Sequence, residues 1–216
     1  MAALLSIDEA FPSRVAGVIR TENPEAAFQA CLAALEGGIG TVEVTTSVPS
    51  CFDIIHGLVA STGGAPVGVG TVWDPAAVRE AKHAGARFVV TPVLLPEVAA
   101  ACHEHDLLCV LGALTPTEIY QARLAGAQLV KVFPISSMGG PAYLRSLFGP
   151  MPGVPLWVSG GVTLDQVDEY LSLGVRAVGL TTALFDPDAL SRGDFDSVRA
   201  RAEQVAKKLG APTGLG

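Results

Sequence analysis

The stretch that decides the fold is LAGAQLVKVFP, residues 124–134. It combines a helix end at Gly126, a short apolar run that suits a buried strand, and a closing proline. The same plan occurs three more times, as EGGIGTVEVTT (36–46), KHAGARFVVTP (82–92) and SLGVRAVGLTT (172–182). Each copy is interpreted as a junction from a helix to a strand. The chain is therefore built from repeated helix–strand units.

Weaker apolar runs supply the remaining strands, at 15–19, 67–70, 107–111 and 155–159. Helix-like segments lie between the runs, and several open with proline, as in NPEAAFQACLAALEGG (23–38). Eight strands alternating with helices predict a parallel sheet closed into a (β/α)8 TIM barrel, with an open doubly wound sheet as the alternative. No linker or low-complexity tract divides the chain. We expect a single domain over residues 1–216.

Composition limits the compartment and the partners. The net charge of −7 argues against binding to nucleic acid or to a membrane surface, because both depend on clustered Lys and Arg. No long uncharged apolar stretch is present, and the start, MAALLSIDEAFPSR, lacks the basic region of an export signal. Four irregularly spaced cysteines form no CxxC pair, so we expect reduced and mostly buried thiols. We expect a cytoplasmic protein.

A lysine inside an apolar run is the most unusual feature of the predicted strands. Alternation along the sixth run places Lys131 on one face with Leu129 and Phe133, and Glu43 and Arg20 fall on the matching faces of the second and first runs. In a (β/α)8 barrel the active site lies at the C-terminal ends of the strands. An amine, a carboxylate and a guanidinium are therefore predicted to point into the mouth of the barrel.

These three groups suit covalent chemistry at a carbonyl. A desolvated amine such as Lys131 can form a Schiff base that accepts electrons, and a carboxylate such as Glu43 can move protons beside it. Arg20 can hold a substrate carboxylate through a bidentate pair. These are the parts of a class I aldolase. The structural alternatives are a lysine that reaches the rim or pairs with Glu43, and an arginine that only caps the rim.

Two later loops predict a phosphate site. Gly160 and Gly161 in VSGGVTLDQVDEY (158–170) follow the seventh run and precede a helix, while Thr181 and Thr182 follow the eighth. Exposed backbone N–H groups at such places bind phosphate, and TIM barrels often hold phosphate after strands seven and eight. The glycines alone are weak evidence, because glycine also serves tight turns.

A metal site is not expected. The segment ACHEHDLLC (101–109) gathers Cys102, His103, His105 and Cys109, but its two histidines are two positions apart, whereas helical zinc motifs place them at i and i+4. The segment also precedes the fifth run, at the end of the barrel opposite the predicted chemistry. It is interpreted as a polar helix end.

The motifs together resemble the family of 2-keto-3-deoxy-6-phosphogluconate and 2-keto-3-deoxy-6-phosphogalactonate aldolases. The resemblance runs through GVIR, VEVT, GVGTVWDP, FVVTP, KVFP, SGGVT and GLTTALF. It implies retro-aldol cleavage to pyruvate and glyceraldehyde 3-phosphate without metal or organic cofactor, possible action on 4-hydroxy-2-oxoglutarate, a role in Entner–Doudoroff-type metabolism, and a homotrimer. The implied site residues are the Schiff-base lysine Lys131, the general acid/base Glu43, the pyruvate-binding Thr71, the aromatic Phe133, and the phosphate-binding Gly160, Gly161 and Thr182.

One position departs from the family pattern. The gluconate enzymes carry arginine shortly after the glutamate, where this chain has Ser47, whereas the galactonate type carries arginine after the first strand, where this chain has Arg20. Both residues, together with Thr91 after the fourth run, are candidates for substrate binding. The resemblance therefore favours the galactonate type. A phosphosugar epimerase or isomerase, and a homologue that binds phosphate without catalysis, remain as alternatives.

Overall fold

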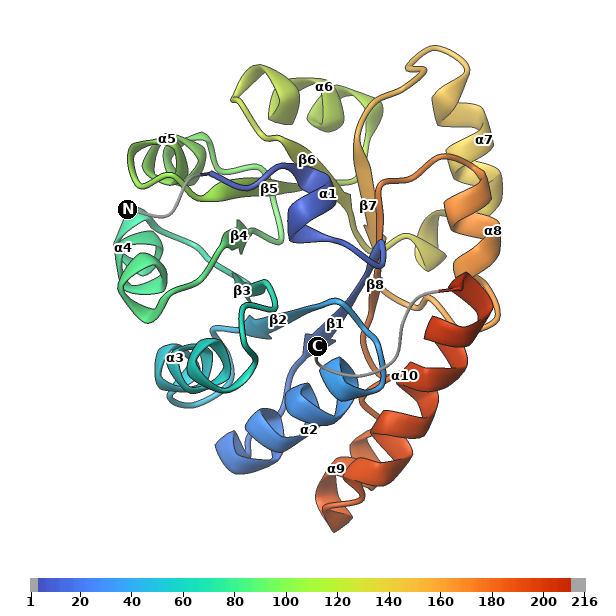
Figure 1. The fold of residues 1–216 in the computed structure, drawn as a ribbon. Helices are drawn as coiled ribbons and strands as arrows, with labels where there is room; N and C mark the ends of the chain where they lie inside the picture. The colour runs from blue at the N-terminus through green and yellow to red at the C-terminus, as the bar shows by residue number, and fades with distance from the viewer. Residues whose placement is uncertain (1–3, 211–216) are drawn as a thin grey trace.

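Residues 4–210 are described by a computed structural model in which the strands close into a parallel barrel (Figure 1). Each strand pairs with the next in chain order, and β1 also pairs with β8. Within this range the strands are β1 (Val15–Ile19), β2 (Thr41–Thr45), β3 (Val67–Gly70), β4 (Phe88–Val90), β5 (Leu108–Ala113), β6 (Leu129–Val132), β7 (Leu156–Ser159) and β8 (Ala177–Leu180). The predicted (β/α)8 barrel is confirmed, and the open sheet is wrong.

Helices surround the strands in a ring (Figure 1). In the described range they are α1 (Ile7–Ala10), α2 (Pro24–Glu36), α3 (Cys51–Ser61), α4 (Pro75–Ala84), α5 (Pro96–Glu104), α6 (Pro116–Leu124), α7 (Pro141–Phe148), α8 (Val167–Ser172), α9 (Pro187–Arg192) and α10 (Phe195–Leu209), with a 3-10 turn at Ser136–Met138. Proline opens several of them, and in α2, α4, α6 and α9 the preceding side chain caps the helix, as when Asp74 accepts a hydrogen bond from the backbone of Ala77.

The strands are buried on both faces, and their alternation separates two cores. Val42 and Val44 of β2, and Val130 and Val132 of β6, belong to the layer between strands and helices. The interior of the barrel has a second cluster that includes Val18, Leu129 and Trp157. This division confirms the face assignment made from period-two alternation. It leaves the side chains of Lys131 and Glu43 on the interior side.

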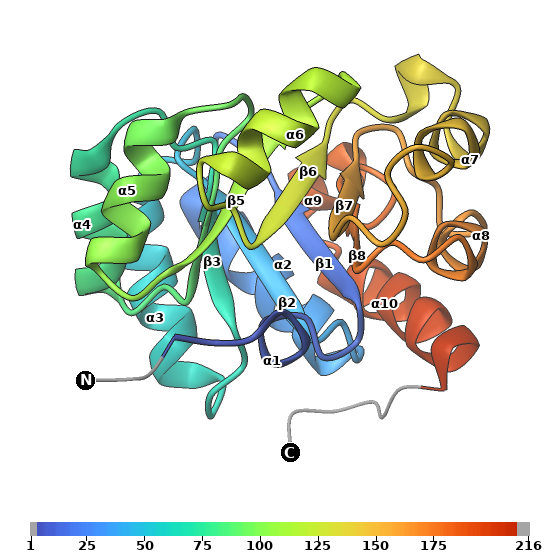
Figure 2. The same ribbon diagram turned by 90° about the horizontal axis from the view of Figure 1, so that it is seen from above.

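Helix α1 lies across one end of the barrel instead of joining the ring (Figure 2). A capping box between Ser6 and Glu9 starts this short helix, and the side chain of Thr41 on β2 donates a 2.6 Å hydrogen bond to the carbonyl of Ala10. Phe11, which follows α1, is buried in the interior cluster. The N-terminal end of the barrel is thus closed by packing, and the opposite end remains for chemistry.

Several sequence expectations concern the limits of the chain. Residues 1–3 and 211–216 lie outside the described range, so the domain limits of 1 and 216 and the first residues of the expected non-exported start stay predictions. Within residues 4–210, no helix is both long enough and apolar enough to cross a bilayer. Cys31, Cys51, Cys102 and Cys109 all fall in this range, and each is a free, buried cysteine as expected.

Candidate active site

A cavity of about 290 Å³ opens at the C-terminal ends of the strands. It is lined by residues from seven strands or the loops that follow them: Val18, Arg20, Glu43, Thr45, Thr71, Pro92, Lys131, Phe133, Ser159, Thr181 and Thr182. Most of the residues predicted from sequence to form the site therefore surround one space. The predicted location of the site at the mouth of the barrel agrees with this cavity.

Lys131 and Glu43 form a buried pair at the base of this cavity. The Nζ atom of Lys131 donates to Oε1 and Oε2 of Glu43 at 3.4 and 3.3 Å, across the barrel interior from β6 to β2. The side chain of Lys131 is 8 % exposed and that of Glu43 is fully buried. Such a pair is a weak source of stability, because removing two charges from water offsets much of their attraction. The arrangement is better suited to chemistry on Nζ with a proton carrier beside it.

Burial dominates the electrostatics of Glu43. Desolvation raises the pKa of its carboxyl, and the positive charges of Lys131 and Arg20 oppose that rise without cancelling it. The space for the carboxyl is created by Gly70 on the neighbouring strand β3, since a Cβ atom there would lie 1.7 Å from Oε1 of Glu43. The carboxyl is thus held dry and close to the amine, in a state that favours proton uptake.

Arg20 reaches from the end of β1 to the ends of β2 and β3. Its guanidinium donates to Oγ of Ser47 at 2.8 Å and to Oγ1 of Thr71 at 2.9 Å. Thr71 has a left-handed backbone with φ of 59°, and the hydroxyl of Thr46 donates to its carbonyl at 2.7 Å. Arg20, Ser47 and Thr71 therefore form one polar cluster beside the lysine. Ser47 contacts the guanidinium from the position where the gluconate pattern has its own arginine.

The predicted phosphate loops follow β7 and β8, and β8 pairs with β1, the strand that precedes Arg20. Thr181 and Thr182 line the cavity, whereas Gly160 and Gly161 are not among the lining residues. Both glycines follow β7 with positive φ values of 89° and 77°, and a Cβ on Gly161 would lie 2.2 Å from the hydroxyl oxygen of Ser136. The backbone there needs glycine for conformation and for space. Their role in phosphate binding stays a prediction.

Thr91, like Ser47, is a candidate that is not among the residues lining the cavity. Its buried hydroxyl donates to the carbonyl of Val93 at 2.5 Å and accepts from the backbone of Gly112 at 3.1 Å. Both hydrogen-bonding functions of the hydroxyl thus serve the local backbone, and the neighbouring Pro92 lines the cavity instead. A substrate contact for Thr91 stays a prediction.

Sequence reasoning did not select four of the lining residues, which are Val18, Thr45, Pro92 and Ser159. The signal was available for Ser159, because a buried polar residue at the end of an apolar strand faces the mouth of a barrel. Its hydroxyl donates to the carbonyl of Gly179 at 3.4 Å. The alternation places Thr45 on the inward face of β2 with Glu43, although no role was assigned to it from sequence.

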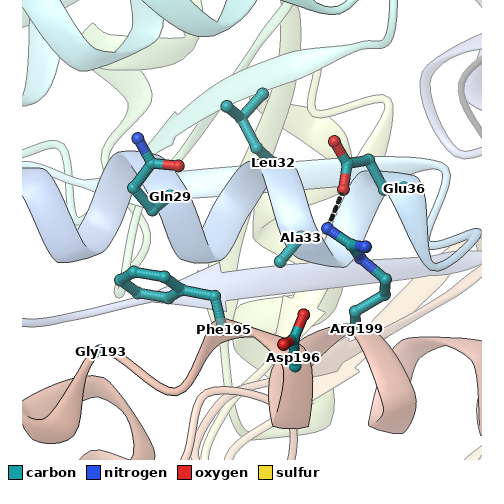
Figure 3. Close-up of a pocket in the computed structure, with 8 residues that line it drawn as sticks. All are labelled: Gln29, Leu32, Ala33, Glu36, Gly193, Phe195, Asp196 and Arg199. Carbon is teal, nitrogen blue, oxygen red and sulfur yellow. Dashed lines mark hydrogen bonds and ion pairs between the residues drawn. The ribbon is translucent and has the colours of Figure 1, made fainter.

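A second hollow lies far from this chemistry, between α2 and α10 on the outer wall (Figure 3). Glu36 and Arg199 project into it and form an ion pair with each other (Figure 3). Within residues 4–210 no cluster of three or more His, Cys, Asp or Glu side chains is arranged to hold a metal ion. In the segment 101–109, His103 contacts the carbonyl of Gly126 at 3.0 Å through Nε2.

The fold and the buried pair at its mouth suit a class of barrel enzymes in which a lysine works beside a carboxylate. The sequence matches the model of the family described as KDPG and KHG aldolase over residues 8–201. The chain belongs to this family. It is an aldolase, a carbon–carbon lyase.

Relatives of both substrate types resemble the chain. It is 31% identical over 198 residues to a 2-dehydro-3-deoxy-phosphogluconate aldolase of Treponema pallidum, covering 91% of this chain and 94% of the relative. It is 32% identical over 187 residues to a probable 2-dehydro-3-deoxy-6-phosphogalactonate aldolase of Rhizobium meliloti, covering 86% of each. A solved KDPG aldolase of Legionella pneumophila, holding pyruvate as a covalent carbinolamine, superimposes with a TM-score of 0.82 at 26% identity, covering 92% of this chain and 96% of that structure.

Proposed function

We propose that this aldolase cleaves a 2-keto-3-deoxy-6-phospho sugar acid to pyruvate and glyceraldehyde 3-phosphate through a Schiff base on Lys131. The observation that carries the proposal is the buried pair, with Nζ of Lys131 3.3 Å from Oε2 of Glu43 at the mouth of the barrel. An epimerase or isomerase would explain a phosphate loop, but it would give no role to a buried amine. The captured pyruvate adduct of the Legionella relative supports a covalent route.

In the proposed first half-reaction, the neutral amine of Lys131 attacks the C2 ketone of the substrate. Glu43 moves the protons that convert the carbonyl oxygen to a hydroxyl and then to a leaving water, directly or through an intervening water. The product is a protonated imine that joins Nζ to C2. Because this imine accepts the electron pair of the bond that breaks, the proposed route needs no metal or organic cofactor.

In the second half-reaction, Glu43 takes the proton of the C4 hydroxyl. The C3–C4 electron pair moves toward the imine, releasing the aldehyde and leaving the enamine of pyruvate on Lys131. Protonation at C3 and hydrolysis then free pyruvate and restore the amine. The buried carboxyl of Glu43 suits both tasks, since a raised pKa brings its titration closer to neutral pH.

Arg20 is proposed to bind the substrate carboxylate, assisted by Thr71, with Phe133 against the pyruvyl part. Its guanidinium already projects across the cavity edge to Ser47 and Thr71. The phosphate is proposed to bind at Gly160, Gly161, Thr181 and Thr182, where backbone N–H groups and hydroxyls can donate to it. Because the arginine comes from β1 and position 47 is serine, we favour the galactonate-type substrate over the gluconate type.

Cleavage assays on three compounds test the proposed substrate. Release of pyruvate would be measured from the phosphogluconate-type epimer, the phosphogalactonate-type epimer and 4-hydroxy-2-oxoglutarate, with Lys131→Met as the inactive control. We expect the galactonate-type compound to give the highest kcat/KM, and the unphosphorylated compound the highest KM. Equal turnover by Lys131→Met would contradict the whole scheme, whereas a gluconate preference would contradict only the role given to Arg20.

We also propose a cytoplasmic homo-oligomer, with a trimer as the expected state. Buried, free cysteines are typical of a reducing compartment. Large apolar side chains are exposed near the mouth of the barrel, where Trp73 is 56% and Val93 43% accessible, as suits an interface between copies. Light scattering at several concentrations tests the state, and a concentration-independent monomer would contradict it.

A further inference from the structure

An aromatic cluster forms the floor beneath the lysine. Phe11, Phe88 and Trp157 pack with ring centroids 5.0 to 6.2 Å apart, and all three side chains are almost completely buried. Two glycines make room for the rings. A Cβ on Gly179 would lie 2.4 Å from Nε1 of Trp157, and a Cβ on Gly68 would lie 2.2 Å from the ring of Phe88. The indole is therefore fixed in place.

This fixed indole lies against the reacting nitrogen. Trp157 on β7 is the register partner of Lys131 on β6, and Nζ lies over the indole, 5.2 Å from its centroid. The ring of Phe133, 5.7 Å away, is a second aromatic neighbour, but it is 38% exposed at the mouth. Both distances fall within the range of cation–π attraction, which is strongest for tryptophan and grows where water is excluded.

The cation on Nζ needs a partner that Glu43 does not supply throughout the cycle. Glu43 is the group that takes up protons, and each uptake removes its negative charge from beside the nitrogen. The indole has no such change of state, because its attraction comes from the quadrupole of the ring. The Nε1 atom of Trp157 is buried and has no hydrogen-bond partner within residues 4–210. The polar interaction of this indole is therefore the contact of its ring face with Nζ of Lys131.

Schiff-base formation conserves the charge that the indole faces. Overall, the ammonium of Lys131 and the ketone of pyruvate give a protonated imine and one water. The nitrogen lone pair forms the bond to C2, the carbonyl oxygen leaves with two protons as water, and one proton stays on nitrogen. The nitrogen is therefore positive before and after the step. It is neutral only in the free amine, the carbinolamine and the later enamine.

We propose that Trp157 is a positioning residue that holds Nζ of Lys131 in its cationic forms and so favours the protonated imine over the neutral carbinolamine and enamine. The inference rests on the proposed function, because it concerns the same covalent intermediate. It assigns to the barrel floor a part in covalent capture that is separate from proton transfer by Glu43 and from carboxylate binding by Arg20.

The test compares two variants that both reduce the volume of Trp157. Trp157→Phe keeps an aromatic face, and loss of Nε1 removes no hydrogen bond, whereas Trp157→Leu removes the aromatic face altogether. Each protein would be incubated with increasing pyruvate, reduced by a short borohydride pulse and weighed by mass spectrometry. At saturating pyruvate we expect the ratio of trapped to untrapped protein to be about fivefold lower in the leucine variant than in the original protein, with the phenylalanine variant between them.

The outcomes separate the two claims. Absence of an adduct on Lys131 in the original protein would overturn the proposed function and the inference together. An adduct in the original protein, with the same trapped fraction at saturating pyruvate in Trp157→Leu, would overturn the inference alone. A retained thermal unfolding transition shows that each variant is folded.

A second measurement leaves Trp157 unchanged, in case its variants fail to fold. The chain has two tryptophans, and Trp73→Phe removes the exposed one, so the remaining emission reports on Trp157. We expect saturating pyruvate to change this emission. In the double variant that also carries Lys131→Met, we expect pyruvate to cause no change. Unchanged emission while the adduct forms, or an equal change in the Lys131→Met protein, would overturn the inference.

Discussion

Burial raises the pKa of the Glu43 carboxyl, whereas the neighbouring cations lower it, and the effect of burial is the larger. Its pKa is raised, so on acidification this carboxyl takes its proton at a higher pH than an ordinary glutamic acid, whose pKa is 4.5. As the proposed base that accepts the C4 hydroxyl proton, the ionised carboxylate is lost below that raised pKa. We therefore expect kcat/KM to fall with decreasing pH through a limb that lies above pH 4.5.

The pH profile of pyruvate release, compared with that of Glu43→Gln, measures this limb. The variant should lose about 100-fold in kcat, and its remaining activity should lack the limb. A limb that persists unchanged in Glu43→Gln would assign the titration to a different group.

A substitution at Gly70 can displace the carboxyl of Glu43 without replacing the glutamate itself. A methyl group there would lie 1.7 Å from Oε1, 2.3 Å from the carboxyl carbon and 2.7 Å from Cγ of Glu43. All three atoms belong to one side chain and none to the backbone, so rotation of Glu43 relieves the overlap. Gly70→Ala should therefore fold while losing about 100-fold in kcat. Gly149→Ala is the matched control, since its Cβ would make an ordinary 3.5 Å contact with the carbonyl of Ser146. Steady-state kinetics decide, and full activity of Gly70→Ala would show that the carboxyl need not stay where it is.

The guanidinium of Arg20 is expected to act on binding. Arg20→Met should raise KM about tenfold or more, because it removes a charge-assisted hydrogen bond to the substrate carboxylate. Ser47→Ala keeps the charge and removes one contact that orients it, so its KM should rise only a fewfold. Initial rates over a range of substrate concentrations measure both variants. An unchanged KM for Arg20→Met would contradict binding of the substrate carboxylate by Arg20 and would favour the alternative in which this arginine only caps the rim of the barrel.

At the scale of single residues, the sequence predicts the position of a side chain where that position follows from strand alternation alone. Lys131, Glu43 and Arg20 were found in this way, and the structure brings them to one cavity. Thr91 has the same strand-end position, but local backbone groups occupy its hydroxyl, and no sequence pattern reports that competition. The contacts of Gly70 with Glu43 and of Trp157 with Lys131 depend on register between neighbouring strands, which the closed barrel determines.

At the scale of elements, the closing segment around α1 is expected to hold the barrel together. Phe11 is 1% exposed and packs against Phe88 and Trp157 at 5.0 and 5.1 Å between centroids. Phe11→Ala should lower the free energy of unfolding by about 3–5 kcal/mol, the usual result of truncating a buried phenylalanine. Urea unfolding measures it. The control is Leu124→Ala on α6, where the side chain is 69% exposed and the expected change is within about 0.5 kcal/mol.

The helices differ in how well the sequence predicts them. Helices with proline at the first turn, such as α2, α4 and α6, were predicted from that signal together with the glycine-rich ends. The closing segment around α1 was not predicted, because a four-residue helix has too few positions to show a helical period. Its place follows from tertiary packing of Phe11, which only the assembled barrel provides.

At the scale of the whole molecule, covalent capture of pyruvate should stabilise the fold. The adduct forms with the folded protein, because only there do Lys131 and Glu43 meet, so ligand binding shifts unfolding to higher temperature. At about a hundredfold excess over its dissociation constant, pyruvate should raise Tm by roughly 5 °C or more. Calorimetry with and without pyruvate measures the shift. Lys131→Met should show none, and an equal shift in that variant would indicate binding that does not involve the amine.

The central claim is that Lys131 is the nucleophile of the aldolase. The most direct measurement is to incubate the protein with pyruvate, reduce it with borohydride, digest it and locate the added mass among the peptides by fragmentation. Every adduct should fall on Lys131, and none on Lys82, Lys207 or Lys208, which lie on the outer helices α4 and α10. No adduct on Lys131, in a sample that still cleaves its substrate, would contradict the account.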